Sequence, residues 1–130
     1  MDIDFSVTKN GKELDKSLYT WDENSKTFST CENGLVLDFI SVNGCTFKTG
    51  GDCTFKTGFG CTFKTGYDCT FDTGGDCTFK TGYDCTFDTG DCCTFKTDDY
   101  CTFKTGEECV AVRRGIFEII KLEKGVKIKI

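Results

Sequence analysis

The sequence predicts an all-β protein, a two-sided β-solenoid of four coils, about 16 residues each, with β-hairpin caps. Three observations predict it. Eight octapeptides of the type CTFKTGYD follow one another over residues 45–108. The two identical copies, at 61–68 and 77–84, begin 16 residues apart. Each copy also divides into a strand-like part and a turn-like part.

Each octapeptide has five residues that favour strands, Cys-Thr-Phe-Lys/Asp-Thr, followed by three that favour a turn, typically Gly-x-Asp. Side chains alternate along a strand, so Cys, Phe and the second Thr share one face, and the first Thr and the charged residue share the other. The charged residue must face water, which turns the phenylalanines inward. The predicted core residues are Phe47, Phe55, Phe63, Phe71, Phe79, Phe87, Phe95 and Phe103.

The length of a coil follows from the size of the core. One octapeptide, at roughly 3.3 Å per residue, is too short to enclose phenylalanine rings, whereas two provide two strands and two turns. The alternative is an eight-stranded antiparallel meander or barrel, which also places every Phe on one face. Asp72 and Asp88 both fall in even-numbered copies and the identical copies are both odd-numbered, which favours the solenoid.

The ends of the chain are not repetitive, and they are predicted to cover the solenoid. Residues 1–44 form an N-terminal β cap, residues 45–108 the solenoid and residues 109–130 a C-terminal β-hairpin cap, all in one folded unit. Asn10-Gly11 predicts a tight hairpin. The apolar residues expected to cover the N-terminal end of the core are Trp21, Phe28, Leu35, Leu37 and Phe39.

Further local patterns predict the remaining turns and edges. A second N-terminal hairpin is expected around residues 22–25, and GLVLDFISV is expected to be a strand that leads into the first coil. The C-terminal hairpin should turn at residues 123–125. The lysines of VKIKI would protect an edge strand, or that strand would serve as a dimer contact.

The composition excludes several function classes. The 130 residues include no histidine, which excludes Ser-His-Asp triads and histidine-ligated zinc. No GxSxG or phosphate-binding loop is present, so we expect no enzyme activity, cofactor or metal. The net charge of −5 argues against a nucleic-acid partner. No apolar run approaches about 18 residues and no signal peptide is visible, so we expect no membrane contact and a cytoplasmic location.

The 11 cysteines are expected to be buried free thiols rather than a disulfide ladder. Nine of them recur at one position of the repeat, which indicates a repeated packing role, and free Cys packs as a small hydrophobe. Stacked cysteines would have parallel Cβ vectors, a poor geometry for disulfide bonds. Cys92 falls in a turn and is the expected exposed, reactive thiol.

The run CTFKTGGDCTFKTGFGCTFKTGYDCTFDTG, with LYTWDENSKTFST and GLVLDF before it and CVAVRRGIFEIIKLEKG after it, resembles a group of CTFKTG octapeptide-repeat proteins. Tailed bacteriophages and environmental viral sequences encode this group. The resemblance covers nearly the whole chain and implies a viral origin and a location in the host cytoplasm. It implies no activity and supplies no site residues. The chain departs from the pattern at Cys92, Asp98 and Tyr100.

Candidate binding residues are the charged and aromatic side chains that the repeat exposes. Four lysines would stack on one face and raise the local potential, and aromatic residues at turn tips fit a protein-binding surface. The candidates are Lys48, Lys64, Lys80, Lys96, Phe59, Tyr67, Tyr83, Tyr100, Asp68 and Asp84.

These residues predict a rigid, non-enzymatic interaction protein that binds a host macromolecule, such as an inhibitor of a host or defence function. The partner would be a host protein or a second copy of the chain. Three alternatives remain open. The first is a structural or assembly element in a virion or in a homo-oligomer joined through the cap edges. The second is a binder of anions or nucleotides. The third is an ice-binding protein that uses the regular outward threonines.

Overall fold

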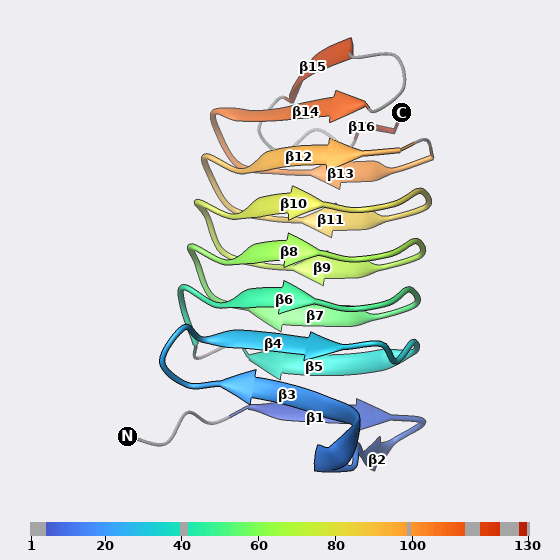
Figure 1. Ribbon diagram of the computed structural model, residues 1–130. Helices are drawn as coiled ribbons and strands as arrows, with labels where there is room; N and C mark the ends of the chain where they lie inside the picture. The colour runs from blue at the N-terminus through green and yellow to red at the C-terminus, as the bar shows by residue number, and fades with distance from the viewer. Residues whose placement is uncertain (1–4, 40–41, 99, 114–117, 123–127, 130) are drawn as a thin grey trace.

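Two eight-stranded sheets face each other along a stack of coils in the computed structural model (Figure 1), which confirms the all-β solenoid. The structure describes residues 5–39, 42–98, 100–113, 118–122 and 128–129. Within these residues the helical structure is a 3₁₀ turn, η1 (Lys16–Leu18), and no helix has the length and apolar character needed to cross a membrane.

Sheet A contains the strands of the even-numbered octapeptides, in the order β16-β13-β11-β9-β7-β5-β1-β2. Its strands are β1 (Ser6–Lys9), β2 (Lys12–Glu13), β5 (Leu35–Phe39), β7 (Thr54–Thr57), β9 (Thr70–Asp72), β11 (Thr86–Asp88), β13 (Thr102–Lys104) and β16 (Ile128–Lys129).

Sheet B contains the strands of the odd-numbered octapeptides, in the order β15-β14-β12-β10-β8-β6-β4-β3. Its strands are β3 (Tyr19–Asp22), β4 (Thr27–Thr30), β6 (Thr46–Lys48), β8 (Thr62–Lys64), β10 (Thr78–Lys80), β12 (Thr94–Thr97), β14 (Cys109–Arg113) and β15 (Glu118–Leu122).

The octapeptide strands pair in parallel with a shift of 16 residues, so each residue lies beside its equivalent in the next coil. Phe79, for example, lies between Phe63 and Phe95 in sheet B. Strands that follow one another in the sequence lie in opposite sheets. The antiparallel meander or barrel is therefore wrong.

The parallel stack extends past the eight octapeptides at both ends. β4 and β5 form a coil ahead of the first octapeptide, with Phe28 beside Phe47 and Leu37 beside Phe55. β14 continues sheet B, with Ala111 beside Phe95. The solenoid is thus longer than the four predicted coils. The first coil escapes the sequence pattern because its equivalent positions are 18 and 19 residues, not 16, from their partners.

Antiparallel strands close the ends of the stack. The two predicted N-terminal hairpins are confirmed, since β1 pairs with β2 and β3 with β4. At the other end, β15 pairs with β14, whereas β16 pairs with β13 in the opposite sheet. The prediction that a hairpin turning at 123–125 joins these last two strands is therefore wrong. The turn itself and the side chains of VKIKI lie outside the described residues.

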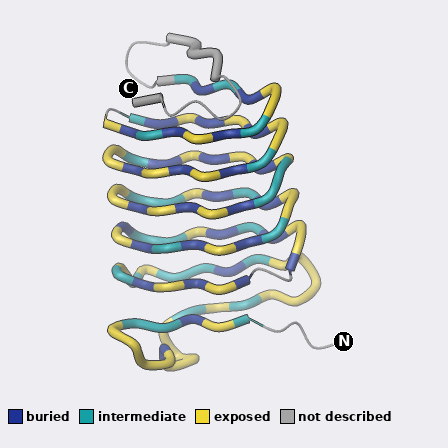
Figure 2. Tube along the Cα trace, turned by 180° about the vertical axis from the view of Figure 1, so that it is seen from behind, coloured by how far each residue is buried: buried dark blue, intermediate teal, exposed yellow. Residues whose placement is uncertain are grey.

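Phenylalanine rings fill the space between the sheets, and all eight predicted core rings are at most 1% exposed. Rings of one sheet stack face to face, as in Phe63–Phe79 at 4.8 Å and 3° between centroids and planes. Rings of opposite sheets meet edge to face, as in Phe79–Phe87 at 5.1 Å and 75°. Both geometries suit the aromatic quadrupole. The burial along the tube in Figure 2 alternates accordingly.

The N-terminal end of this core is covered as predicted. Phe28, Leu35, Leu37 and Phe39 are fully buried, and Trp21 packs against them half-buried. Further aromatic and aliphatic residues that the sequence pattern did not single out join this end, namely Phe5, Val7, Leu14 and Tyr19.

The turns fit the stack because two of their positions carry special residues. The eighth residue of each octapeptide has a positive φ, for example 57° at Asp68 and 60° at Cys92, a conformation that Asp tolerates better than Cys. At the sixth position, a Cβ on Gly90 would lie 2.8 Å from the nitrogen of Gly75 in the preceding coil. Glycine at this position therefore permits the close approach of successive turns.

We expect Phe79→Ala to lower the free energy of unfolding by about 3–5 kcal/mol, because a large buried side chain is lost and a cavity remains. Phe79 stacks on two rings and meets two more edge to face. Phe59→Ala is the matched control, since that ring is 58% exposed, and it should change stability by less than about 0.5 kcal/mol. Denaturant titration of both variants measures the difference, and equal losses would contradict this account of the core.

Candidate binding surface

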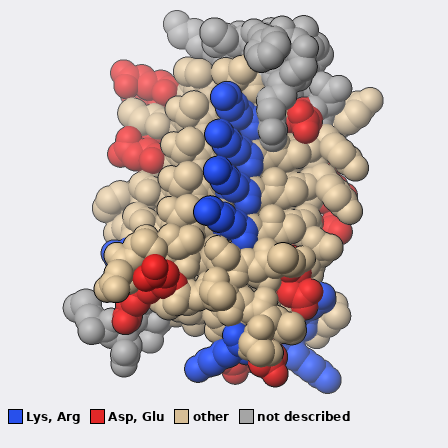
Figure 3. Space-filling model, in the orientation of Figure 1, with Lys and Arg blue, Asp and Glu red and all other residues tan. Residues whose placement is uncertain are grey.

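The outer face of sheet B carries an uninterrupted column of lysines, as the sequence predicted. The parallel register places the four side chains on successive strands at about 4.8 Å intervals. Figure 3 shows them as one vertical row on this face. We call this row the lysine column: Lys48, Lys64, Lys80 and Lys96.

The ammonium groups of the lysine column form no ion pair with any residue that the structure describes. The ion pair found in those residues joins Lys9 Nζ to Glu32 Oε1 at 3.9 Å, away from the column. All four lysines are exposed. Four like charges held side by side raise the local potential and attract anionic groups.

Two tyrosines stack at the turns that follow the lysine column. The ring centroids of Tyr67 and Tyr83 lie 5.3 Å apart with an angle of 8° between the planes. Their side chains remain 44% and 47% exposed. Asp68 and Asp84 follow them in the same turns and are exposed. The structure thus places one predicted aromatic pair and two predicted carboxylates together at one edge.

The other two predicted aromatic residues do not join this pair. Phe59 lies in a turn after an even-numbered strand, at the opposite edge of the solenoid, where its carbonyl accepts a hydrogen bond from Gly44 N at 3.0 Å. Tyr100 occupies the eighth position of its octapeptide, whereas Tyr67 and Tyr83 occupy the seventh. These residues are exposed by 58% and 63% but are not parts of one cluster.

The outer face of sheet A differs in charge. Its equivalent column has mixed signs, because the register aligns Lys56 with Asp72, Asp72 with Asp88, and Asp88 with Lys104. The positive potential is therefore confined to the face of sheet B. Lys56 and Lys104 provide matched controls, since they occupy the same repeat position on the opposite face.

Nine of the eleven cysteines are buried free thiols in two columns between the sheets and the turns, as expected. Their sulfurs lie near turn carbonyls, for example Cys77 Sγ to Gly75 O at 3.4 Å. Hydrogen bonds also run along a column: those with Cys61 raise the pKa of the Cys45 and Cys77 thiols, and the same bonds lower the pKa of Cys61. Among the described residues, no cluster of three Cys, Asp or Glu could hold a metal ion.

Two thiols are exposed, Cys31 and Cys92. Desolvation by neighbouring atoms, the hydrogen bond that Cys92 donates to Glu108 at 3.6 Å, and nearby carboxylates raise the pKa of the Cys92 thiol. The exposure predicted for Cys92 is confirmed, but its acidic surroundings disfavour the reactive thiolate. The sequence pattern did not single out Cys31.

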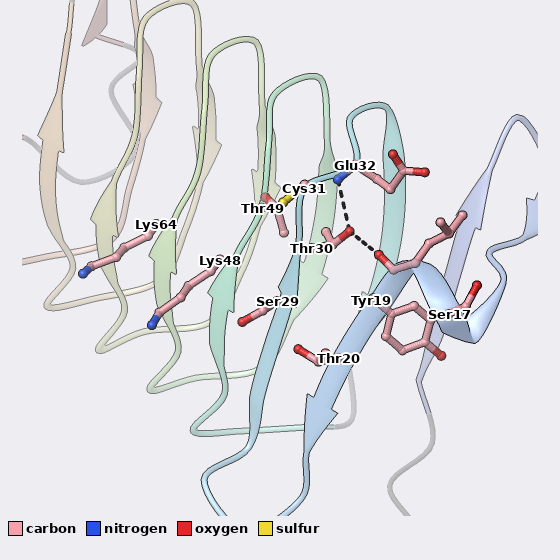
Figure 4. A pocket seen from close by; sticks show the side chains of 11 residues that line it. Ser17, Tyr19, Thr20, Ser29, Thr30, Cys31, Glu32, Lys48, Thr49 and Lys64 are labelled. Carbon is pink, nitrogen blue, oxygen red and sulfur yellow. Dashed lines mark hydrogen bonds between the residues drawn. The ribbon is translucent and has the colours of Figure 1, made fainter.

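A groove of about 610 Å³ opens where the lysine column meets the N-terminal hairpins (Figure 4). It is lined by Ser17, Leu18, Tyr19, Thr20, Ser29, Thr30, Cys31, Glu32, Lys48, Thr49 and Lys64. Sequence reasoning missed it because the chain around β3 and β4 lacks the octapeptide spacing. The Thr-Phe-Ser at residues 27–29, which resembles the Thr-Phe-Lys of the repeat, is the signal that marks Ser29 as a member of the same column.

Thiol counting tests the arrangement of the cysteines. In the native protein, Cys31 and Cys92 should react rapidly with a coloured disulfide reagent, and the nine buried thiols should react slowly because unfolding limits their access. In denaturant without reductant, all 11 thiols should react. A lower count in denaturant would show disulfides and contradict the free-thiol columns.

The raised pKa of Cys92 predicts how its alkylation depends on pH. In a Cys31→Ser background, the rate with iodoacetamide should rise with a midpoint above the ordinary thiol value of about 8.5, since the thiolate is the nucleophile. Glu108→Gln should lower that midpoint, because it removes a carboxylate that disfavours the thiolate. Glu13→Gln, on exposed strand β2, is the control and should leave the midpoint unchanged. A midpoint unaffected by Glu108→Gln would overturn the proposed cause.

Comparisons with known proteins provide no relative for the chain. No family model, curated protein or solved structure matches it. Function is therefore inferred from the lysine column, the tyrosine pair and the groove.

Proposed function

We propose that the protein is a rigid, non-enzymatic binding module of viral origin. Its sheet B face docks onto an acidic patch of a host protein in the host cytoplasm and blocks that protein's function. The observation that carries this proposal is the lysine column, in which four exposed ammonium groups have no ion-pair partner among the described residues. The viral origin rests on the resemblance of the CTFKTG repeats described above.

The β-ladder makes this column a preorganised surface. Each lysine is attached to a strand whose neighbours fix its position, so only the side chains lose freedom when a partner binds. The four positions span about 14 Å, three intervals of about 4.8 Å. An acidic patch on a globular protein has a comparable length, and complementary charge speeds association.

The stacked tyrosines supply the apolar part of such an interface. Tyr67 and Tyr83 each follow a lysine of the column by three residues, and almost half of each side chain is exposed. Their rings already pack on each other at 5.3 Å, so they lose little freedom on binding. Exposed tyrosines beside basic residues are typical of the residues that dominate binding energy.

The acidic turns favour a compact protein partner over a nucleic acid. Carboxylates lie along the edge next to the lysine column, and others surround Cys92 at the opposite edge. A long polyanion that crossed either edge would meet like charge, whereas a patch limited to the face would not. The carboxylates of the near edge are Asp52, Asp68 and Asp84.

Two alternatives receive less support from the same geometry. The described sheets end in antiparallel strands, two of them only two residues long, which gives a second copy little edge for continued parallel pairing. The outward threonines share their face with the lysine column, so sheet B offers no uncharged plane for ice.

Capture from a bacterial host lysate by paired variants tests the proposal. The wild-type protein and Lys56→Gln/Lys104→Gln should retain the same stoichiometric partner. Lys80→Gln/Lys96→Gln should bind it at least about tenfold more weakly, because the lost charges belong to the docking face. Retention should also fall with added salt.

Two results would contradict the proposal. Equal retention by both double variants would show that sheet B is not the docking face. No retained partner, together with a defined oligomer by light scattering, would instead support the assembly element.

A further inference from the structure

The groove at the foot of the lysine column combines four donor side chains on one side. Thr20 pairs with Ser29, Ser29 with Lys48, and Lys48 with Lys64, each on a neighbouring strand of sheet B. Figure 4 shows these four side chains projecting to the same side of the sheet. The outward column thus begins with two hydroxyl groups and continues with two ammonium groups.

These donors are available to a ligand. Among the residues that the structure describes, none of the four side chains forms a hydrogen bond or an ion pair. The carboxylate in the groove, that of Glu32, lies 3.9 Å from Lys9 Nζ and points away from Lys48 and Lys64 in Figure 4. The donor row therefore faces no neutralising charge inside the groove.

The opposite wall of the groove is more apolar and is fixed in place. Leu18 is 45% exposed there, and the half-buried ring of Tyr19 lines the groove beside it. Thr30 Oγ1 donates to Leu18 O at 2.7 Å and accepts from Glu32 N at 3.1 Å. These bonds tie the η1 wall to the end of β4, so the groove is formed before any ligand binds.

We propose that this groove binds an organic phosphate of nucleotide size. The phosphomonoester group would contact Lys48, Lys64, Ser29 and Thr20, and the attached organic group would lie against Leu18 and Tyr19. A phosphomonoester carries nearly two negative charges and three acceptor oxygens, which match two ammonium and two hydroxyl donors. The groove volume of about 610 Å³ lies within the range of small-molecule sites, roughly 300–1,000 Å³.

This site goes beyond the proposed docking function and does not depend on it. The docking test changes Lys80 and Lys96, which lie outside the groove lining, whereas the ligand test changes Lys48 and Lys64. Ligand binding is measured on the purified protein without any partner, so each proposal can fail while the other holds.

Isothermal titration with a nucleoside 5′-monophosphate is the direct test. We expect one ligand per chain, with at least about tenfold weaker binding to Lys48→Gln/Lys64→Gln because both charge-assisted contacts are lost. Lys80→Gln/Lys96→Gln removes the same charge from the same column and should change the affinity less than about twofold. Amide shifts by NMR at positions 20, 29, 48 and 64 should accompany binding, and thermal melts confirm that each variant is folded.

Three probes separate the two halves of the site. The nucleoside without phosphate should bind at least about tenfold more weakly than the monophosphate. Leu18→Ala should weaken the monophosphate but leave inorganic phosphate unchanged, because only the organic group contacts that side chain.

Several results would overturn the proposal. One is the absence of heat and shifts at millimolar monophosphate, and another is an equal loss in both lysine double variants. Inorganic phosphate binding as tightly as the monophosphate would also overturn it, since the lysine column would then act only as a diffuse counter-charge.

Discussion

Face-to-face stacking of identical phenylalanines is the interaction on which the rest of the structure depends. A ring at one coil lies 4.8 to 5.1 Å from its equivalent in the next octapeptide coil, which is also the spacing of paired strands. The rings and the backbone ladder therefore reinforce the same register. A slip by one residue would turn every Phe outward and every Lys inward, so the register is strongly specified.

The same register creates the features that we assign to function. It aligns equivalent outward residues whether or not their contact is favourable, so lysine lies beside lysine on sheet B. Neighbouring like charges oppose stability. The mixed column on sheet A shows that the repeat tolerates Asp at this position, for instance at Asp72. Retention of four lysines on one face, against this cost, is the physical reason to assign that face to binding.

The sequence allows prediction of most of the fold, because one octapeptide defines the strand, the inward residues and the turn. Phe63 and Tyr67 occur where the alternation and the 16-residue period place them. The prediction fails where the period changes. Phe28 belongs to the stack although it precedes Phe47 by 19 residues, and β16 pairs across the end of the stack instead of with its neighbour in sequence. The groove depends on where β3 leaves the stack, which local patterns do not encode.

The two-octapeptide coil gives the chain a parity. Adding or removing a pair of octapeptides changes the length of the stack by about 4.8 Å and leaves every other side chain on its original sheet. Adding or removing a single one moves all later residues to the opposite sheet, as a reading-frame shift changes all later codons. Such an event between Lys64 and Lys80 would split the lysine column into two halves on opposite faces. Recombination among these near-identical repeats can therefore lengthen the binding face without redesign, but only in steps of two.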